Sequence, residues 1–215
     1  MKTILLKDVA ALIPDGASVM IGGFMGVGTP ERLIDEFVRQ GKKNLTVIAN
    51  DNALPGIGIG KLISAGAVKK TIASHIGLNP ETQKKMLAGE LEVDLVPQGT
   101  LIERIRAGGF GLGGVLTPTG VGTVVETGKQ RIEVGGKPYL LETALRADFA
   151  LVDAFLADYI GNLYYALTAR NFNPVIAMAA DTVIVEAENI VPVGVISPDN
   201  VMTPAPVVDY IISHA

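Results

Sequence analysis

Two hydrophobic periods alternate along this chain and divide it into strands and helices. Short apolar runs predict buried strands at 18–21, 44–50, 68–74, 91–97, 147–158 and 181–188. Apolar residues at helical spacing predict a helix at 30–40, and start or stop residues predict helices at 79–89, 98–109 and 173–180. Strands separated by helices of this length predict an α/β fold, in which helices cover an open, largely parallel sheet.

The pattern changes in the second half of the chain. Residues 131–142 predict a β-hairpin that turns at Gly135-Gly136, and residues 163–167 are expected to pair back onto strand 147–158. At the amino end, Lys7 and Asp8 interrupt the apolar run, which favours a short amphipathic helix over a signal peptide. We find no repeat and no linker, so residues 1–215 are predicted to form a single domain.

Three helices have recognisable starts, in each of which a polar residue precedes a proline. These starts predict Thr29, Asn79 and Asn173 as N-caps, with the following prolines in the first helical position. Gly41 and Gly89 are the expected ends of the first two of these helices.

A glycine-rich turn joins the first buried strand to the first of these helices. Four glycines lie within the seven residues Gly22, Gly23, Phe24, Met25, Gly26, Val27 and Gly28. Such a turn points backbone N–H groups at whatever lies over the helix start, which favours an anion or a developing oxyanion. The P-loop Gly-Lys-Ser/Thr is absent, and so is the third glycine of the dinucleotide fingerprint. The turn alone leaves open whether it binds a ligand or is only a tight connection.

Composition narrows the function classes. The 215 residues are 48% hydrophobic and 5% aromatic, which indicates a core of Val, Ile, Leu and Ala. The net charge of −4 comes from mixed signs, so nothing suggests binding to nucleic acid or to an anionic membrane. The absence of cysteine excludes disulfides and Cys-ligated metals, and no acidic cluster has the spacing of a known metal loop. The expected compartment is the cytoplasm.

Catalytic groups are scarce. The two histidines are His75, at a strand end, and His214, next to the last residue, and we assign neither a catalytic role. Gln98 follows another strand; it can orient a substrate by hydrogen bonding but cannot carry a proton, and it could equally cap its own turn. Asn50, Asp51 and Asn52 follow the second strand, where α/β proteins place their sites. The sequence therefore predicts an anion-binding turn but no nucleophile. This combination is what one half of an active site would contain.

Six blocks, in order, resemble the family I coenzyme A (CoA) transferases. They are "DGASVMIGGFMGVGTP", "SHIGLNPET", "VPQGTLIERIRAGG", "LTPTGVGT", "GNLYY" and "RNFNP". The resemblance covers nearly the whole chain, and it is strongest to the alpha (A) subunits of the acetate and butyrate–acetoacetate enzymes.

This resemblance implies a ping-pong reaction, in which CoA moves from an acyl-CoA to a free carboxylic acid. It also implies that the nucleophilic glutamate belongs to a beta subunit, within a Ser-Glu-Asn-Gly motif that this chain lacks. The segment Gly22–Gly28 is implied to bind CoA, and Gln98 to support the site. CoA is then a substrate with no tightly bound cofactor, and two alpha chains are expected to assemble with two beta chains.

Three positions complicate the resemblance. Asp51 aligns with the nucleophilic glutamate if the two subunits are duplicates of one fold, and we interpret it as the vestige of that site. Asp153 stands where many relatives have Lys or Arg, and Ala205 where they usually have Gly. Two other functions on this type of fold stay open: a sugar-phosphate isomerase, as in the ribose-5-phosphate and glucosamine-phosphate isomerases, and a sensor of acyl-CoA or sugar phosphate.

Overall fold

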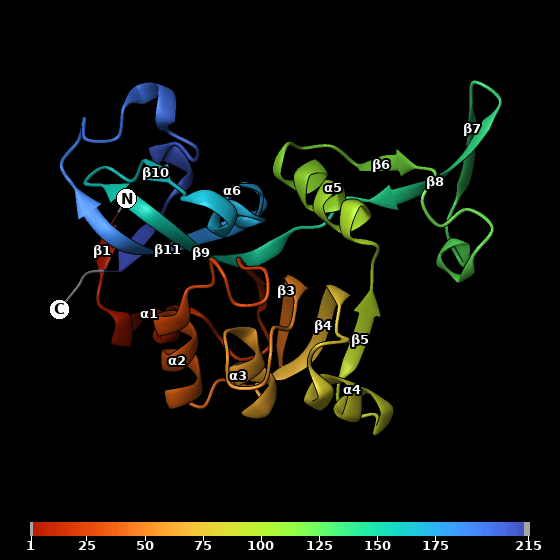
Figure 1. Ribbon diagram of the computed structural model, residues 1–215, viewed down its shortest axis with the longest axis horizontal. Coiled ribbons are helices and arrows are strands. Elements are labelled where there is room, and N and C mark those ends of the chain that lie inside the picture. The colour runs from red at the N-terminus through yellow and green to blue at the C-terminus, as the bar shows by residue number, and fades with distance from the viewer. Residues whose placement is uncertain (1, 213–215) are drawn as a thin grey trace.

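The computed structural model describes residues 2–212, in which the largest element is a nine-stranded sheet (Figure 1). Eight strands form one row, and β10 (Leu163–Tyr164) pairs antiparallel with β9 beside them. All pairs within the row are parallel. The order of the row is β1 (Lys2–Ile4), β12 (Tyr210–Ile212), β11 (Ala180–Val191), β9 (Ala147–Asp158), β2 (Ser18–Ile21), β3 (Leu45–Asp51), β4 (Val68–His75) and β5 (Glu92–Leu95). The predicted open, largely parallel sheet is confirmed.

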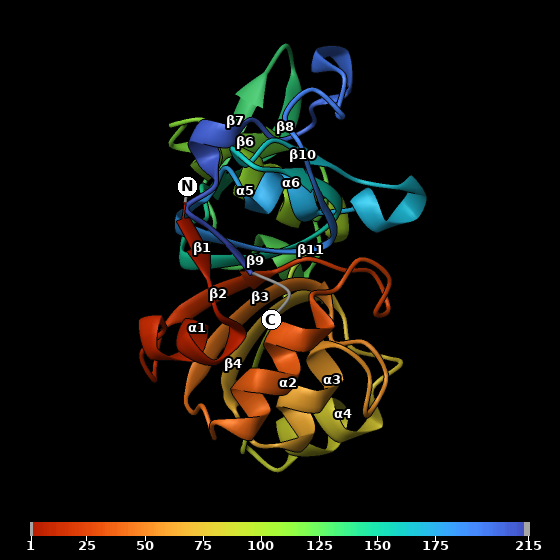
Figure 2. The same cartoon turned by 90° about the vertical axis from the view of Figure 1, so that its left-hand side faces the viewer.

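Helices cover both faces of this sheet (Figures 1 and 2). One face carries α1 (Leu6–Leu12), α2 (Glu31–Arg39), α3 (Ile59–Ser64) and α4 (Pro80–Leu87), and the other carries α5 (Gln98–Gly109) and α6 (Asn173–Ile176). Because successive side chains of a strand point to opposite faces, β2 feeds two cores. Val19 and Ile21 pack with α2 and α3, whereas Met20 packs with α5 and α6.

A small antiparallel sheet stands to one side of the main sheet (Figure 1). Its order is β6 (Gly114–Thr117), β8 (Lys137–Thr143), β7 (Arg131–Val134). The hairpin β7–β8 turns at Gly135 and Gly136, both with positive φ, as a two-residue hairpin loop requires. The predicted hairpin is therefore confirmed, and β6 adds a third strand to it. The short 3-10 helices are η1 (Val124–Glu126), η2 (Leu167–Arg170), η3 (Pro198–Asn200) and η4 (Ala205–Val207).

The predicted helix caps are right for one helix and wrong for two. Asn79 caps α4, since its side chain accepts a hydrogen bond from Thr82 N at 3.0 Å. Helix α2 instead begins after Pro30, and α6 begins at Asn173 itself. In the first turn of α2 the N–H groups of Arg32 and Leu33 donate to the carboxylate of Glu186 on β11, at 3.2 and 2.9 Å. The carboxylate of Glu186, which is distant in sequence, therefore caps α2 in place of Thr29.

The sheet also explains where a site can form. The chain leaves β2 toward β3 on one side, and it leaves β9 toward β11 on the other. The carboxyl ends of β2 and β9 therefore mark the switch point at which open α/β sheets bind their ligands. The turn Gly22–Gly28 follows β2 at this point, and the segment that contains η2 and α6 follows β9.

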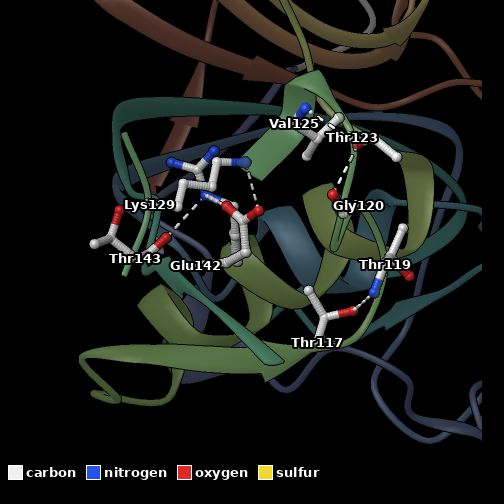
Figure 3. A network of polar contacts seen from close by, with 9 residues as sticks. Thr117, Thr119, Gly120, Thr123, Val125, Lys129, Glu142 and Thr143 are labelled. Atoms are coloured by element: carbon white, nitrogen blue, oxygen red, sulfur yellow. Dashed lines mark hydrogen bonds and ion pairs between the residues drawn. The ribbon is translucent and has the colours of Figure 1, made fainter. Parts of the chain in front are cut away.

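A buried ion pair ties the small sheet together (Figure 3). The carboxylate of Glu142 is 2% exposed; it lies 2.6 Å from Lys129 Nζ and 3.9 Å from Arg104 Nε. Arg104 extends from α5 and also donates to Thr143 O at 2.8 Å. The network therefore couples the small sheet to a helix of the main fold.

We predict that Glu142→Ala lowers the free energy of unfolding by about 3 kcal/mol, because it leaves two cations without their buried partner. Chemical denaturation measures the loss, and hydrogen exchange in β8 should accelerate with it. The control is Glu133→Ala, an exposed position on the same hairpin, which should stay within about 0.5 kcal/mol of wild type. Equal stability of the two variants would contradict the role given to Glu142.

Candidate functional site

The turn Gly22–Gly28 forms a miniature hairpin above the carboxyl end of β2. Phe24 and Val27 exchange two backbone hydrogen bonds of 3.0 Å. The tip between them consists of Met25 and Gly26, with φ of +50° and +91°. A non-glycine residue in this left-handed region costs energy and persists only where its surroundings hold it.

Most N–H groups of the turn already have partners inside the chain. Gly23 N donates to Asn171 Oδ1 at 3.0 Å, and Met25 N donates to Asp51 Oδ2 at 3.0 Å. Within residues 2–212, the N–H groups of Gly26 and Gly28 have no hydrogen-bond partner. The turn can therefore offer two amides to an acceptor from outside, fewer than the glycine pattern suggests.

A carboxylate of the chain itself lies at the helix start beneath the turn. Glu186 accepts from the N–H groups of Arg32 and Leu33 in the first turn of α2, so it occupies part of the place at which an outside anion was expected. This corrects the expected anion site, which combined the turn with the helix end.

Other parts of the chain pack closely against the glycines of the turn. A Cβ at Gly22 would lie 1.8 Å from Asn173 Oδ1, and one at Gly28 would lie 2.4 Å from Ala169 O. A Cβ at Gly26 would lie 2.6 Å from a methyl carbon of Ile57. The glycines therefore allow other parts of the same chain to pack closely against the turn.

Asp51 lies buried below the tip of the turn. Its carboxylate accepts hydrogen bonds from Met25 N, from Ala53 N at 2.7 Å and from Asn50 Nδ2 at 2.7 Å. These bonds occupy both carboxylate oxygens and hold Met25 in its unusual conformation. Asp51 acts here as a support of the turn.

Gln98 joins the same network from the start of α5. Its Nε2 donates to Asn50 Oδ1 at 2.5 Å, and it makes no cap of its own helix, so the capping alternative is wrong. The polar chain runs from Gln98 through Asn50 and Asp51 to Met25 N. The structure thus brings together strand-end residues that the sequence identified separately. Asn52 belongs to a different network, with Thr71 and Thr82.

Two carboxylates lie side by side where β9 and β11 pair, at Asp153 and Glu186. Burial, followed by the negative charges of Glu186, Glu188 and Glu31, raises the pKa of Asp153 to about 7. Burial also raises the pKa of Glu186, although the N–H groups of Leu33 and Arg32 act against it. Asp153 therefore retains its proton up to about pH 7.

The remaining residues identified from the sequence are not part of the turn. His75 is exposed at the end of β4, and Gly77 packs against its ring. Ala205 begins η4, where its N–H donates to Asn162 Oδ1 at 3.0 Å. His214 lies outside the described residues. No group of three His, Cys, Asp or Glu side chains in residues 2–212 could hold a metal ion.

A cavity of about 590 Å³ opens beside the turn. Apolar side chains and one guanidinium line it: Phe24, Val27, Leu167, Thr168, Arg170 and Asn171. Such a lining suits a ligand with an apolar part and a negative charge. None of the helices in residues 2–212 is both long and apolar enough to cross a membrane.

Sequence reasoning missed two asparagines that contact the turn. Asn171 donates to Val27 O and Asn173 donates to Gly28 O, each at 2.9 Å. The sequence indicates "RNFNP" only as a block that resembles the family and as the start of a helix. The signal that could have found them is two asparagines in the connection from β9 to β11, which leaves the sheet beside the switch point.

Comparison with known proteins identifies the type of molecule. Residues 3–214 match the family model described as coenzyme A transferase. The chain is 56% identical to the acetate CoA-transferase subunit alpha of Escherichia coli K12, over 98% of this chain and 96% of that protein. It is 54% identical to the acetoacetyl-CoA:acetate/butyrate CoA transferase alpha subunit of Clostridium acetobutylicum, over 99% and 98%.

The fold is also that of a solved structure, an acyl-CoA transferase from E. coli O157:H7 in a thioester complex with CoA. The TM-score is 0.87 at 22% identity; the match covers 99% of this chain and 47% of the other. This chain thus spans about half of that protein, and the likeness concerns the fold.

We predict that Asp153 makes the protein less stable as the pH rises. Its pKa of about 7 in the fold exceeds the ordinary value of 3.8, so the native state binds the extra proton between these values. The free energy of unfolding should therefore fall as pH rises from about 4 to 7. Asp153→Asn should weaken this slope and gain on the order of a few kcal/mol at pH 8. Denaturant titrations at several pH values measure it.

The matched control is Asp199→Asn, an exposed position in η3. It should keep the wild-type dependence of stability on pH. If Asp153→Asn keeps that dependence as well, the proton is not held at Asp153.

Proposed function

The chain belongs to the coenzyme A transferase family, and from that premise we propose that it is the alpha subunit of an enzyme that moves CoA between a short-chain acyl-CoA and a free carboxylic acid. The acids are of the acetate, butyrate and acetoacetate class. This proposal is supported by two relatives with more than half of their residues identical, which carry those acids in their names and match over nearly their full lengths. CoA is accordingly a substrate.

The reaction follows a ping-pong course through a glutamate of a beta subunit. The glutamate carboxylate attacks the thioester carbonyl, the C–S bond breaks, and an acyl-glutamyl anhydride and CoA thiolate result. The thiolate then attacks the glutamyl carbonyl, which releases the first acid and leaves a glutamyl–CoA thioester. The incoming acid repeats these steps in reverse, so no external oxidant or proton source is needed.

In this reaction the turn Gly22–Gly28 contacts CoA beside the reacting carbonyl. The observation that carries this assignment is the pair of N–H groups at Gly26 and Gly28 without partners in residues 2–212. Each tetrahedral intermediate places negative charge on the former carbonyl oxygen, and preorganised backbone donors stabilise such a charge. Gln98 supports the turn through Asn50 and Asp51.

The nucleophile comes from the beta subunit, within its Ser-Glu-Asn-Gly motif. Asp51 is the residue of this chain that aligns with the nucleophilic glutamate of the beta subunit. Its carboxylate oxygens accept hydrogen bonds from Met25 N, Asn50 Nδ2 and Ala53 N. We assign it as a vestige of the duplicated site that now supports the turn. Two alpha and two beta chains form the assembly. No specific observation favours the isomerase or the sensor.

We predict that this chain alone does not exchange acyl groups and that activity appears when the beta subunit is added. The physical reason is that the donors and the nucleophile lie on different chains. The measurement is acetyl-CoA formation from acetoacetyl-CoA and acetate, with each chain alone and with both together. Robust acyl exchange by this chain alone would contradict the assignment of the nucleophile to the beta subunit.

We further predict that Gly26→Val leaves an assembled complex with turnover reduced about 10²–10³-fold, the usual loss for one oxyanion donor. Valine strains the φ of +91°, contacts Ile57 and obstructs approach to the N–H. The control is Gly41→Val, which has a similar φ of +68° but no atom within 4 Å of its Cβ. The control should lose stability and keep turnover. If Gly26→Val assembles and turns over normally, the turn is only a connection.

A further inference from the structure

The side chain of Asn171 spans the base of the glycine turn. Its Oδ1 accepts from Gly23 N at 3.0 Å, and its Nδ2 donates to Val27 O at 2.9 Å. These two partners stand on opposite arms of the miniature hairpin. Because a carboxamide has an acceptor and a donor side by side, one side chain can fix both arms at once.

Asn173 holds the end of the same turn from below. It is fully buried, its Nδ2 donates to Gly28 O at 2.9 Å, and its Oδ1 accepts from Asp153 N at 3.0 Å. Gly22 packs so closely on this carboxamide that any side chain at position 22 would overlap it. Asn173 thus links the turn to β9, a rigid strand of the main sheet.

The segment that carries these asparagines is itself unusual. Leu167 has a φ of +47° and is 94% exposed, so strain and exposure occur together beside the turn. Strained residues of this kind persist where the surroundings hold them, and they cluster at functional sites. Asn171 also lines the 590 Å³ cavity. The segment therefore faces the place assigned to the substrate.

We propose that Asn171 and Asn173 form an asparagine clamp, a pair of positioning residues that fix the direction of the Gly26 and Gly28 N–H groups. The inference rests on the proposed function, because it takes those amides as the donors to the reacting oxygen. Donors stabilise a developing charge only if they are oriented before the reaction. Asp51 fixes the tip of the turn, and the clamp fixes both arms and the end.

The clamp predicts a specific kinetic signature. In the complex with the beta subunit, Asn171→Ala should lower kcat about 10²-fold, as expected for a small misplacement of the reacting groups. The KM for acetoacetyl-CoA should change by less than about threefold, since one turn is only part of a CoA contact surface. The control is Asn189→Ala, an exposed asparagine with a single bond of 3.4 Å to Phe155 O, which should keep wild-type kcat.

A double-mutant cycle separates positioning from general structure. If Asn171 acts through the turn, adding Asn171→Ala to Gly26→Val should lower kcat little further, because the turn is already displaced. Two multiplied losses would overturn the proposal. So would wild-type kcat in assembled Asn171→Ala.

A conservative variant serves if Asn171→Ala fails to assemble. Asn171→Asp keeps the shape and the acceptor for Gly23 N but cannot donate to Val27 O while ionised. Its kcat should be low at pH 8 and recover relative to wild type as the pH falls, because a protonated carboxyl can donate. A pH-independent ratio would count against the clamp. A wild-type complex that transfers no CoA would contradict the proposed function instead, so the two failures are distinct.

Discussion

The close approach of the Gly22–Gly28 turn to the segment Ala169–Asn173 is the contact on which the site depends. It is possible only because Gly22 and Gly28 lack side chains, since a Cβ at either would come within 2.4 Å of an oxygen of that segment. The approach lets two carboxamides satisfy the turn's polar backbone, which buried backbone groups require. Within residues 2–212 the clamp and Asp51 leave the N–H groups of Gly26 and Gly28 without partners, and the proposed function uses these two donors.

Internal carboxylates shape the rest of the site. Glu186 neutralises the start of α2, and Asp51 supports the tip of the turn, so both anionic positions near β2 are filled by the chain itself. Asp153 adds a carboxyl group whose pKa burial and the neighbouring carboxylates raise to about 7. Under the proposed function, the groups left to meet a charged substrate are the backbone donors of the turn and Arg170 at the cavity, and residues 2–212 hold no metal ligand set.

The fold was largely predictable, because strand and helix periods are local signals that tertiary packing does not reverse. Asn79 is right as a cap for the same reason: its partner Thr82 is three residues away. Thr29 is wrong because Glu186, more than 150 residues later, takes the same amides. The turn and Gln98 could be identified as candidates, but the contact between the turn and the clamp could not, since Gly23 and Asn171 are 148 positions apart. Long-range hydrogen bonds between backbone and side chain leave no periodic trace in a sequence.

The central claim is that this chain supplies the oriented donors and another chain supplies the nucleophile. The most direct test is to incubate the assembled complex with acetoacetyl-CoA, trap the covalent thioester, and locate the modified peptide by mass spectrometry. The account predicts CoA on a glutamate of the beta subunit and an unmodified Asp51 in this chain. Modification of Asp51, or of any other carboxylate of this chain, would contradict it.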